Sequence, residues 1–350
     1  MAISMGPHQS MQEKSEIIPI FVLGSARNGT TWLGNVLCRH PEIVGAEHKA
    51  HWGQHECHAY LCHQYVGDLR NDYNLIRFLE LYSTADFFQL VEGDKEFFYQ
   101  NRPENFFDFF LTLMDRYARK KKVRHWVAKL DPLFYYHDKE LRQFLALLQR
   151  RYHTFHFISI KREFQSVLQS YLHMEGDHSI HQLPPLTKRL ATFLESARYV
   201  EHYRVIERLI RSHQGLAIAY EDLRHQSEDQ LRQICQFLSL NFSTDMMQPA
   251  YKPNSSFLHA PQTSDVSTFT VWCASTIYTK IFALCPPLAW ALLRLRDLTR
   301  PKTVPFSWRL LRLKYQRESF ANELKRTGQI ALYQMLFEDQ EADWPTNAPR

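Results

Sequence analysis

FVLGSARNGTTWLGNVL, residues 21–37, joins an apolar run to a small-residue turn and then to a helix-like pattern. The run 17–23 is apolar and rich in β-branched residues, which is typical of a strand buried on both faces of a parallel sheet. Residues 30–39 have helical periodicity. Between them, Gly24 and Gly29 have the G-x-x-x-x-G spacing of a loop whose backbone N–H groups bind a phosphate at a helix N-terminus. The stretch therefore predicts a strand, an anion-binding loop and a helix.

The loop lacks the lysine of nucleoside-triphosphate loops. In those loops Lys and Ser/Thr follow the second glycine, and they bind the β/γ-phosphates and Mg²⁺. Here Thr30 and Thr31 follow Gly29, and the cation lies inside the loop as Arg27. The sequence thus predicts a phosphate site that does not depend on the usual lysine.

Other apolar runs alternate with amphipathic segments along the chain. Three further strands are expected at 125–130, 154–160 and 215–220. The helical segments between and after them are 138–151, 163–174, 187–213 and 228–239. This alternation predicts an α/β fold, with a P-loop-type parallel sheet flanked by helices and right-handed crossovers.

The 350 residues are enough for one main domain with a helical appendage. We expect a flexible N-terminus at 1–16, the α/β domain at 17–262 and a helical C-terminal extension at 263–350 packed on it. The aromatic-rich segment 64–122 is expected to be a helical insertion that caps the site.

Composition indicates an ordinary globular protein, with 45% hydrophobic and 23% charged residues, and argues against disorder or a fibre. The net charge of +5 mildly favours phosphate-bearing partners without indicating nucleic acid. The first residues contain no apolar core of a signal peptide, so we expect a cytoplasmic protein. Six irregularly spaced cysteines indicate reduced thiols.

The loop continues as R-N-G-T-T-W, which resembles the sulfotransferases that use 3′-phosphoadenosine 5′-phosphosulfate (PAPS). Their 5′-phosphosulfate loop reads [KR]-[SG]-G-T-T, often followed by Trp. The resemblance implies that this loop binds the 5′-phosphosulfate, and its matching residues are Arg27, Gly29, Thr30, Thr31 and Trp32. Asn28 departs from the pattern because it stands where Ser or Gly is usual.

A second element of the same family binds the 3′-phosphate through an Arg at a strand end and a Ser eight residues later. Arg162 and Ser170 have this spacing, which places them two helical turns apart on one face. The segments AIAYEDL (217–223) and NSSF (254–257) resemble further family segments. They imply that Tyr220, Ser255 and Phe257 contact the adenine and a phosphate, while Trp32 stacks on the base; Trp32 and Phe257 can equally be core aromatics.

The resemblance covers 17–48, 125–174 and 215–257. The C-terminal R-K-G-x-x-G-D-W-K signature of the cytosolic small-molecule branch is absent. The chain is therefore more similar to the bacterial, carbohydrate-modifying and protein-modifying branches.

Two cations are candidates for the transfer chemistry. A sulfuryl group carries one negative charge, so a fixed cation at the bridging oxygen can stabilise the leaving phosphate without a metal, and Arg27 is the candidate. Lys129, at the end of the run 125–130, matches a family lysine that touches the sulfuryl oxygens; a lysine there can instead extend to solvent. In-line transfer depends on such positioning and electrostatics.

The acceptor needs a general base. The segment HPEIVGAEHKAH (40–51) resembles one that brings an acidic residue over the loop, so Glu47 or His48 is the candidate base. Asp131 is a third candidate, because it stands where the cytosolic branch has its catalytic His.

Other features are given ordinary interpretations. The His and Cys residues of 51–63 include i,i+4 pairs that could bind Zn²⁺, but no second pair accompanies them and no metal is expected. The run 119–122 is a solvated helix end or a contact for an anionic acceptor. The apolar part of 266–314 is too interrupted to span a bilayer, and it either packs as a hairpin or contacts a membrane surface peripherally.

These observations predict a sulfotransferase that converts PAPS to 3′-phosphoadenosine 5′-phosphate (PAP) and modifies a hydroxyl or an amine. The aromatics of 64–122 favour an acceptor with apolar parts. The alternatives are a P-loop kinase or nucleotide phosphotransferase, for which Y-E-D would be a magnesium-binding strand end, and a catalytically inactive nucleotide-binding protein.

Overall fold

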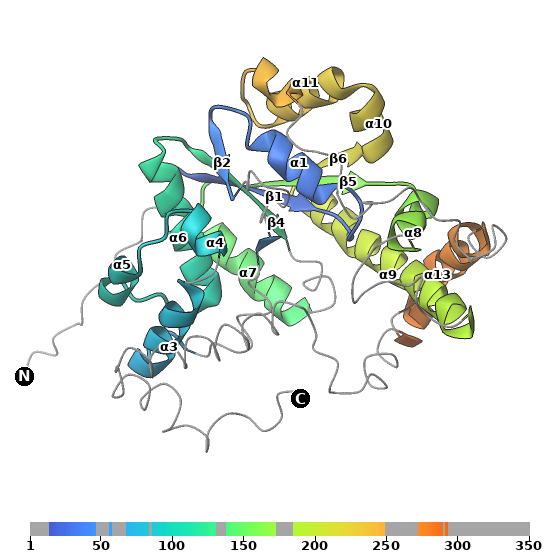
Figure 1. The fold of residues 1–350 in the computed structure, drawn as a ribbon, viewed down its shortest axis with the longest axis horizontal. Helices are drawn as coiled ribbons and strands as arrows, with labels where there is room; N and C mark the ends of the chain where they lie inside the picture. Colours follow the sequence, from blue (N-terminus) through green and yellow to red (C-terminus); the bar gives the residue numbers. More distant parts are fainter. Residues whose placement is uncertain are drawn as a thin grey trace, which may run out of the picture.

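A parallel β-sheet lies at the centre of the protein (Figure 1). The structure, a computed structural model, describes residues 14–46, 56–57, 68–83, 86–130, 138–172, 185–248, 272–289 and 291–292. The strand order is β2-β4-β1-β5-β6. Both β2 and β3 pair with β4: β2 pairs with its first residues, and β3 pairs with its last two. The strands are β1 (Ile18–Leu23), β2 (Ile43–Gly45), β3 (Glu56–Cys57), β4 (His125–Leu130), β5 (His156–Lys161) and β6 (Leu216–Ala219).

The α/β class and the four predicted strands are confirmed. Sequence analysis did not find β2 and β3, since runs of three and two residues carry no periodicity. The described helices are α1 (Thr30–Leu37), α3 (Asp72–Tyr82), α4 (Asp86–Leu90), α5 (Lys95–Gln100), α6 (Phe106–Lys120), α7 (Asp138–Arg151), α8 (Phe164–Leu172), α9 (Pro185–Ser212), α10 (Tyr220–His225), α11 (Ser227–Phe237), the 3₁₀-helix η3 (Thr244–Met247), the π-helix η5 (Cys273–Tyr278) and α13 (Thr279–Leu284).

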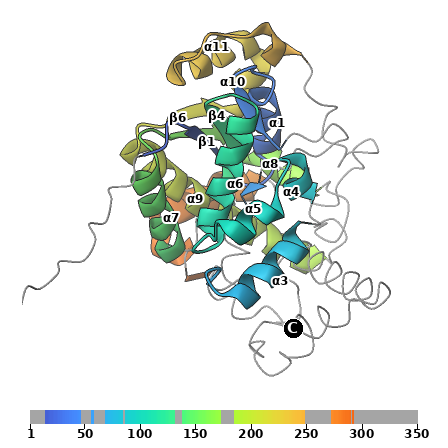
Figure 2. The same ribbon diagram turned by 90° about the vertical axis from the view of Figure 1, so that its left-hand side faces the viewer.

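Two apolar layers cover the two faces of the sheet, with α1 and α11 on one face and α6, α7 and α9 on the other (Figures 1 and 2). Strand β1 contributes to both, because alternate side chains of a strand point to opposite faces. Ile20 and Val22 belong to the first layer, whereas Phe21 belongs to the second, where its ring contacts Trp126 with centroids 5.3 Å apart. The run 17–23 is thus apolar throughout because both faces are buried.

The aromatic residues of the insertion form part of the second layer. Phe109 of α6 is fully buried, and its ring centroid lies 4.7 Å from that of Phe78 and 4.5 Å from that of Phe98. Phe110 of the same helix contacts Trp126 of the sheet, with centroids 6.0 Å apart. These rings pack the core, so they do not support the expectation of an acceptor with apolar parts. A cap over the site stays a prediction.

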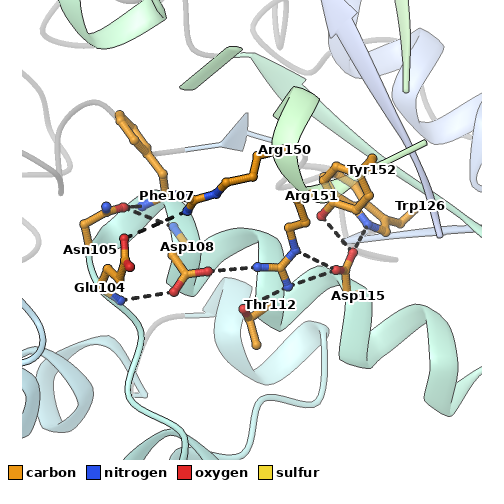
Figure 3. A network of polar contacts seen from close by, with 10 residues as sticks. All are labelled: Glu104, Asn105, Phe107, Asp108, Thr112, Asp115, Trp126, Arg150, Arg151 and Tyr152. Atoms are coloured by element: carbon orange, nitrogen blue, oxygen red, sulfur yellow. Dashed lines mark hydrogen bonds and ion pairs between the residues drawn. The ribbon is translucent and has the colours of Figure 1, made fainter. Parts of the chain in front are cut away.

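A buried carboxylate ties α6 to α7 and β4 (Figure 3). Asp115 of α6 is 1% exposed and accepts hydrogen bonds from Nε1 of Trp126 (2.9 Å), the hydroxyl of Tyr152 (2.9 Å) and Nε of Arg151 (3.0 Å). Arg151 also donates to Asp108 at 2.8 Å. Burial raises the pKa of Asp115, while the charge of Arg151 acts in the opposite direction. The network therefore holds the insertion on the sheet through a buried carboxylate that is paired with a partly buried arginine.

The C-terminal part that the structure describes packs on α9. The ring of Phe193 on α9 contacts Tyr278 and Phe282, with centroids 4.9 and 5.1 Å away. Ile281 and Leu284 on α13 are exposed. Within the described ranges, no helix is both long and apolar enough to cross a membrane. Peripheral membrane contact through 266–314 and the cytoplasmic location stay predictions, and residues 1–13 lie outside the described residues.

Replacing Asp115 by Ala is expected to lower the free energy of unfolding by about 3–5 kcal/mol, because it leaves Nε1 of Trp126 and the hydroxyl of Tyr152 buried without their acceptor and removes one of the two carboxylates paired with Arg151. Urea unfolding measures this change. Glu228→Ala is the control, since its ion pair with Arg232 is more than half exposed and contributes about 0.5 kcal/mol. Equal losses for the two variants would contradict a structural role for the network.

His125, at the start of β4, predicts acid sensitivity. Burial, followed by the charges of His156 and Arg124, lowers the pKa of His125 to about 4. The unfolded chain then binds a proton below pH about 6.5 that the folded chain does not bind, so stability falls as the pH falls toward 4, by up to about 1.4 kcal/mol per unit. Unfolding curves for His125→Gln should show a weaker loss over this window; a loss of the same slope would exclude His125 as its source.

Candidate active site

The parallel register brings the carboxyl ends of several strands to one edge of the sheet. Val22 near the end of β1 pairs with Lys129 of β4, and Leu23 pairs with Ser159 of β5. At the next pair of strands, Lys161 pairs with Ala219. Residues that follow these strands therefore meet at one edge, which is where open α/β sheets bind their ligands.

Glycine is required where the loop after β1 meets the first turn of α1. Gly29 has φ of 90°, and a Cβ there would lie 2.7 Å from the ring of Tyr220. A Cβ on Gly24 would lie 2.5 Å from Cγ2 of Thr30. No side chain caps the first turn of α1 from Gly29, so its N–H groups and helix dipole can face an anion. The close packing around both glycines therefore requires this loop conformation, and the binding of a phosphate by the loop stays a prediction.

Arg27 connects the two predicted anion sites. Its backbone has φ of 69°, in the left-handed region that few residues other than glycine adopt. Its Nε donates a hydrogen bond of 2.9 Å to Oγ of Ser170 on α8. The cation predicted for the phosphosulfate side therefore contacts the hydroxyl predicted for the 3′-phosphate side.

Arg162, Tyr220 and Trp32 form a group next to the loop. The guanidinium of Arg162 lies over the ring of Tyr220, 4.7 Å from its centroid, and the Trp32 ring meets the Tyr220 ring edge-on at 5.7 Å. The Nε of Arg162 is buried and has no hydrogen-bond partner among the described residues. A buried donor without an acceptor is costly, so it fits a ligand oxygen. The binding of a 3′-phosphate by this donor stays a prediction.

Lys129 points into the structure and does not extend to solvent. The residue is 8% exposed, and its Nζ donates to Oγ1 of Thr31 at 2.9 Å. Thr31 lies in the first turn of α1, so the ammonium is held beside the helix N-terminus. Of the two interpretations of Lys129, the structure favours the one that places it at the site.

Three residues of α9 form hydrogen bonds to the loop and to the end of β5, and sequence analysis did not find them. The hydroxyl of Tyr199 donates to the carbonyl of Arg162 (2.6 Å), and that of Tyr203 donates to the carbonyl of Ile160 (2.7 Å). Nδ1 of the buried His202 is 2.9 Å from Oγ of Ser25 in the loop. Their i, i+3, i+4 spacing marked one helix face, but nothing in it indicated which strand ends that face meets.

Several predicted residues lie outside the described residues, namely Glu47, His48, Asp131, Ser255 and Phe257. Their roles stay predictions. The His and Cys side chains of 51–63 also lie outside the described part, and within that part no group of three or more His, Cys, Asp or Glu residues could hold a metal ion.

The basic run 119–122 interacts with an acidic residue. Lys120 and Lys121 both form ion pairs with Glu92, and these contacts lower the pKa of Glu92 to about 2. The pairs are exposed, which favours a solvated helix end over an anion-binding surface.

Comparison with known proteins agrees with this geometry. Residues 19–244, well over half of the chain, match the model of a sulfotransferase family. The chain belongs to the sulfotransferase family. No curated protein matches it.

The chain is also similar, at low identity, to solved sulfotransferase structures. The chain is 18% identical to the sulfotransferase domain of the olefin synthase of Synechococcus PCC 7002, with 78% of this chain and 96% of that domain covered and a TM-score of 0.47. The sulfotransferase domain of the curacin biosynthetic pathway is 17% identical, with 89% and 99% covered and a TM-score of 0.45. Sulfotransferase STF1 of Mycobacterium tuberculosis is 17% identical, with 74% and 76% covered and a TM-score of 0.38. The family assignment rests on the model match.

Replacing Gly29 by Ala is expected to destabilise the protein by about 1–3 kcal/mol, because of its positive φ and the contact with Tyr220. The double variant Gly29→Ala/Tyr220→Ala separates the two causes. It should lose less stability in urea unfolding than the sum of the single losses, since the ring that the new Cβ meets is gone. Additive losses would show that backbone strain alone makes glycine necessary.

Proposed function

We propose that this sulfotransferase moves the sulfuryl group of PAPS to a hydroxyl or an amine of an acceptor and leaves PAP. The contact between the two anion-binding elements supports this donor most directly. The loop and the Arg162 region are joined by the 2.9 Å hydrogen bond from Arg27 to Ser170 and by a 2.7 Å hydrogen bond from the backbone N–H of Arg162 to Asn28. An adenosine that carries phosphates at its 5′ and 3′ positions would place one anionic group at each of these two elements.

Each group has a role in the proposed reaction. The first turn of α1 supplies N–H groups and a positive dipole end for the 5′-phosphosulfate. Lys129, beside that turn, is placed to neutralise the sulfuryl oxygens, and Arg27 to neutralise the bridging oxygen. Arg162 and Ser170 bind the 3′-phosphate, and Tyr220 and Trp32 contact the adenine. The donor supplies an activated sulfuryl group, and fixed charges around it stabilise the in-line transition state.

The general base is proposed among Glu47, His48 and Asp131. Two of them come soon after strands that are neighbours in the sheet. Glu47 comes two residues after β2, and Asp131 comes directly after β4. A base deprotonates the attacking hydroxyl and contributes about 10²–10⁴-fold to the rate.

A kinase is the less favoured alternative. The residues Tyr220, Glu221 and Asp222 were the candidate magnesium-binding strand end. However, Oε1 of Glu221 accepts a hydrogen bond of 3.1 Å from the backbone N–H of Glu163, and Asp222 is exposed in the first turn of α10. The carboxylate of Glu221 is thus engaged in positioning the start of α8. A direct assay of sulfuryl transfer distinguishes the other alternative, a catalytically inactive nucleotide-binding protein, from an enzyme.

The proposed donor is tested by thermal unfolding with PAP, adenosine 5′-phosphate and ATP·Mg²⁺. A ligand that binds only the native state raises the midpoint, and a concentration of 100 times Kd adds about 2.7 kcal/mol. We expect PAP to give the largest shift at equal concentration. A larger shift with ATP·Mg²⁺ would replace the sulfotransferase proposal with the kinase.

Replacing Lys129 by Met is expected to lower sulfuryl transfer about 10²–10³-fold, because one preorganised charge is lost at the transferred group. PAP lacks the sulfuryl group, so its affinity should change much less. Turnover with PAPS and calorimetry with PAP measure the two effects. Lys161→Met is the matched control: this lysine also ends a strand of the sheet, but it is exposed and paired with Glu207. Full activity of Lys129→Met would remove Lys129 from the reaction.

A further inference from the structure

We propose that Asn28 is a positioning residue that sets the spacing between the two anion-binding subsites, and thereby makes the protein selective for a nucleotide phosphorylated at both the 5′ and 3′ positions. This inference rests on the proposed function. It concerns the one loop residue that departs from the family pattern, because Ser or Gly is usual at this position.

Asn28 joins the loop to β5 through both ends of its side-chain amide. The residue is fully buried. Its Nδ2 donates to the carbonyls of Ser25 (3.1 Å) and Ala26 (3.2 Å) in the loop. Its Oδ1 accepts the backbone N–H of Arg162 at 2.7 Å, across 134 residues of sequence. An amide combines two donors with an acceptor, whereas Ser is too short to span this gap and Gly has no side chain.

The hydrogen bond to Arg162 fixes the main chain that carries the candidate 3′-phosphate ligand. Asn28 holds the N–H of Arg162, and the hydroxyl of Tyr199 holds its carbonyl at 2.6 Å. The peptide groups on both sides of its Cα are thereby clamped, and the guanidinium lies over Tyr220. Since a displacement of about 1 Å in a positioned group can cost about 10²-fold, this clamp controls how well the 3′-phosphate is bound.

The second link between the subsites is of a different kind. The hydrogen bond from Arg27 to Ser170 joins two side chains that are both proposed to bind the donor. A bound phosphate therefore competes with that contact. The hydrogen bonds of Asn28 go to main-chain atoms, so they persist when the ligand binds. Asn28 is thus the link that sets the spacing in the complex.

The test compares Kd for PAP with Kd for adenosine 5′-phosphate by calorimetry. The two ligands differ only in the 3′-phosphate, so their ratio reports on the Arg162 side of the site. We expect Asn28→Ser to reduce the preference for PAP about tenfold, mainly by weakening PAP binding. A purely structural role would lower the melting temperature and weaken both ligands alike, leaving the ratio unchanged.

Two tyrosines of α9 provide a matched pair of variants. Tyr199→Phe removes the other half of the clamp on Arg162, so it should also reduce the preference for PAP. Tyr203→Phe removes a hydrogen bond of similar length to the carbonyl of Ile160 and should leave the ratio unchanged. This pair tests the clamp on Arg162 even if Asn28→Ser does not fold. Each variant loses a single hydroxyl, so the two differ only in which main-chain carbonyl loses its hydrogen bond.

The outcomes are distinguishable. If the wild-type protein does not prefer PAP, the proposed function and this inference both fall. If the wild type prefers PAP and Asn28→Ser keeps the ratio within about twofold, the inference is wrong while the proposed function stands. Where Asn28→Ser does not fold, an unchanged ratio in Tyr199→Phe overturns the clamp in the same way.

Discussion

The parallel register of β1 with β4 and β5 is the constraint on which the site depends. Because Val22 pairs with Lys129 and Leu23 pairs with Ser159, the loop after β1 begins beside the ends of both neighbouring strands. A slip of one residue would turn the buried faces of these strands over, and both apolar layers oppose that slip. The burial of the core therefore also places Lys129 and the start of α8 around the N-terminus of α1.

The helix α9 transmits this constraint to the loop. Its apolar face packs on the sheet, and Tyr199 and Tyr203 donate to main-chain carbonyls around the end of β5. His202 from the same helix contacts Ser25 in the loop. Buried main-chain N–H and C=O groups are costly when they are unpaired, and the two tyrosine hydroxyls satisfy main-chain carbonyls where the strand ends and its ladder stops. The loop thereby rests on a rigid element.

Sequence alone was sufficient for the elements whose signals are local. The apolar run of β1, the two glycines, and the spacing of Arg162 and Ser170 all lie within single strand–turn–helix units, and the structure contains each unit. The contact of Arg27 with Ser170 could not be predicted, since it depends on how β1 and β5 pair. The phenylalanines of the insertion were interpreted as a feature of the acceptor site, yet they pack the core, because periodicity does not reveal which neighbour a buried face meets.

Departures from ordinary local rules gather at this one edge of the sheet. Arg27 adopts a left-handed backbone conformation, and Nε of Arg162 is buried without a partner among the described residues. Each of these two features destabilises the folded protein. The fold itself does not need either feature, since a glycine at position 27 or a shorter residue at position 162 would remove the destabilisation. Such costs persist where a ligand recovers them, and an anion next to both arginines would do so. Preorganised cations also lose little further conformational freedom when a ligand binds. A rigid site therefore stabilises the transition state of a group transfer better than a flexible site of equal charge does.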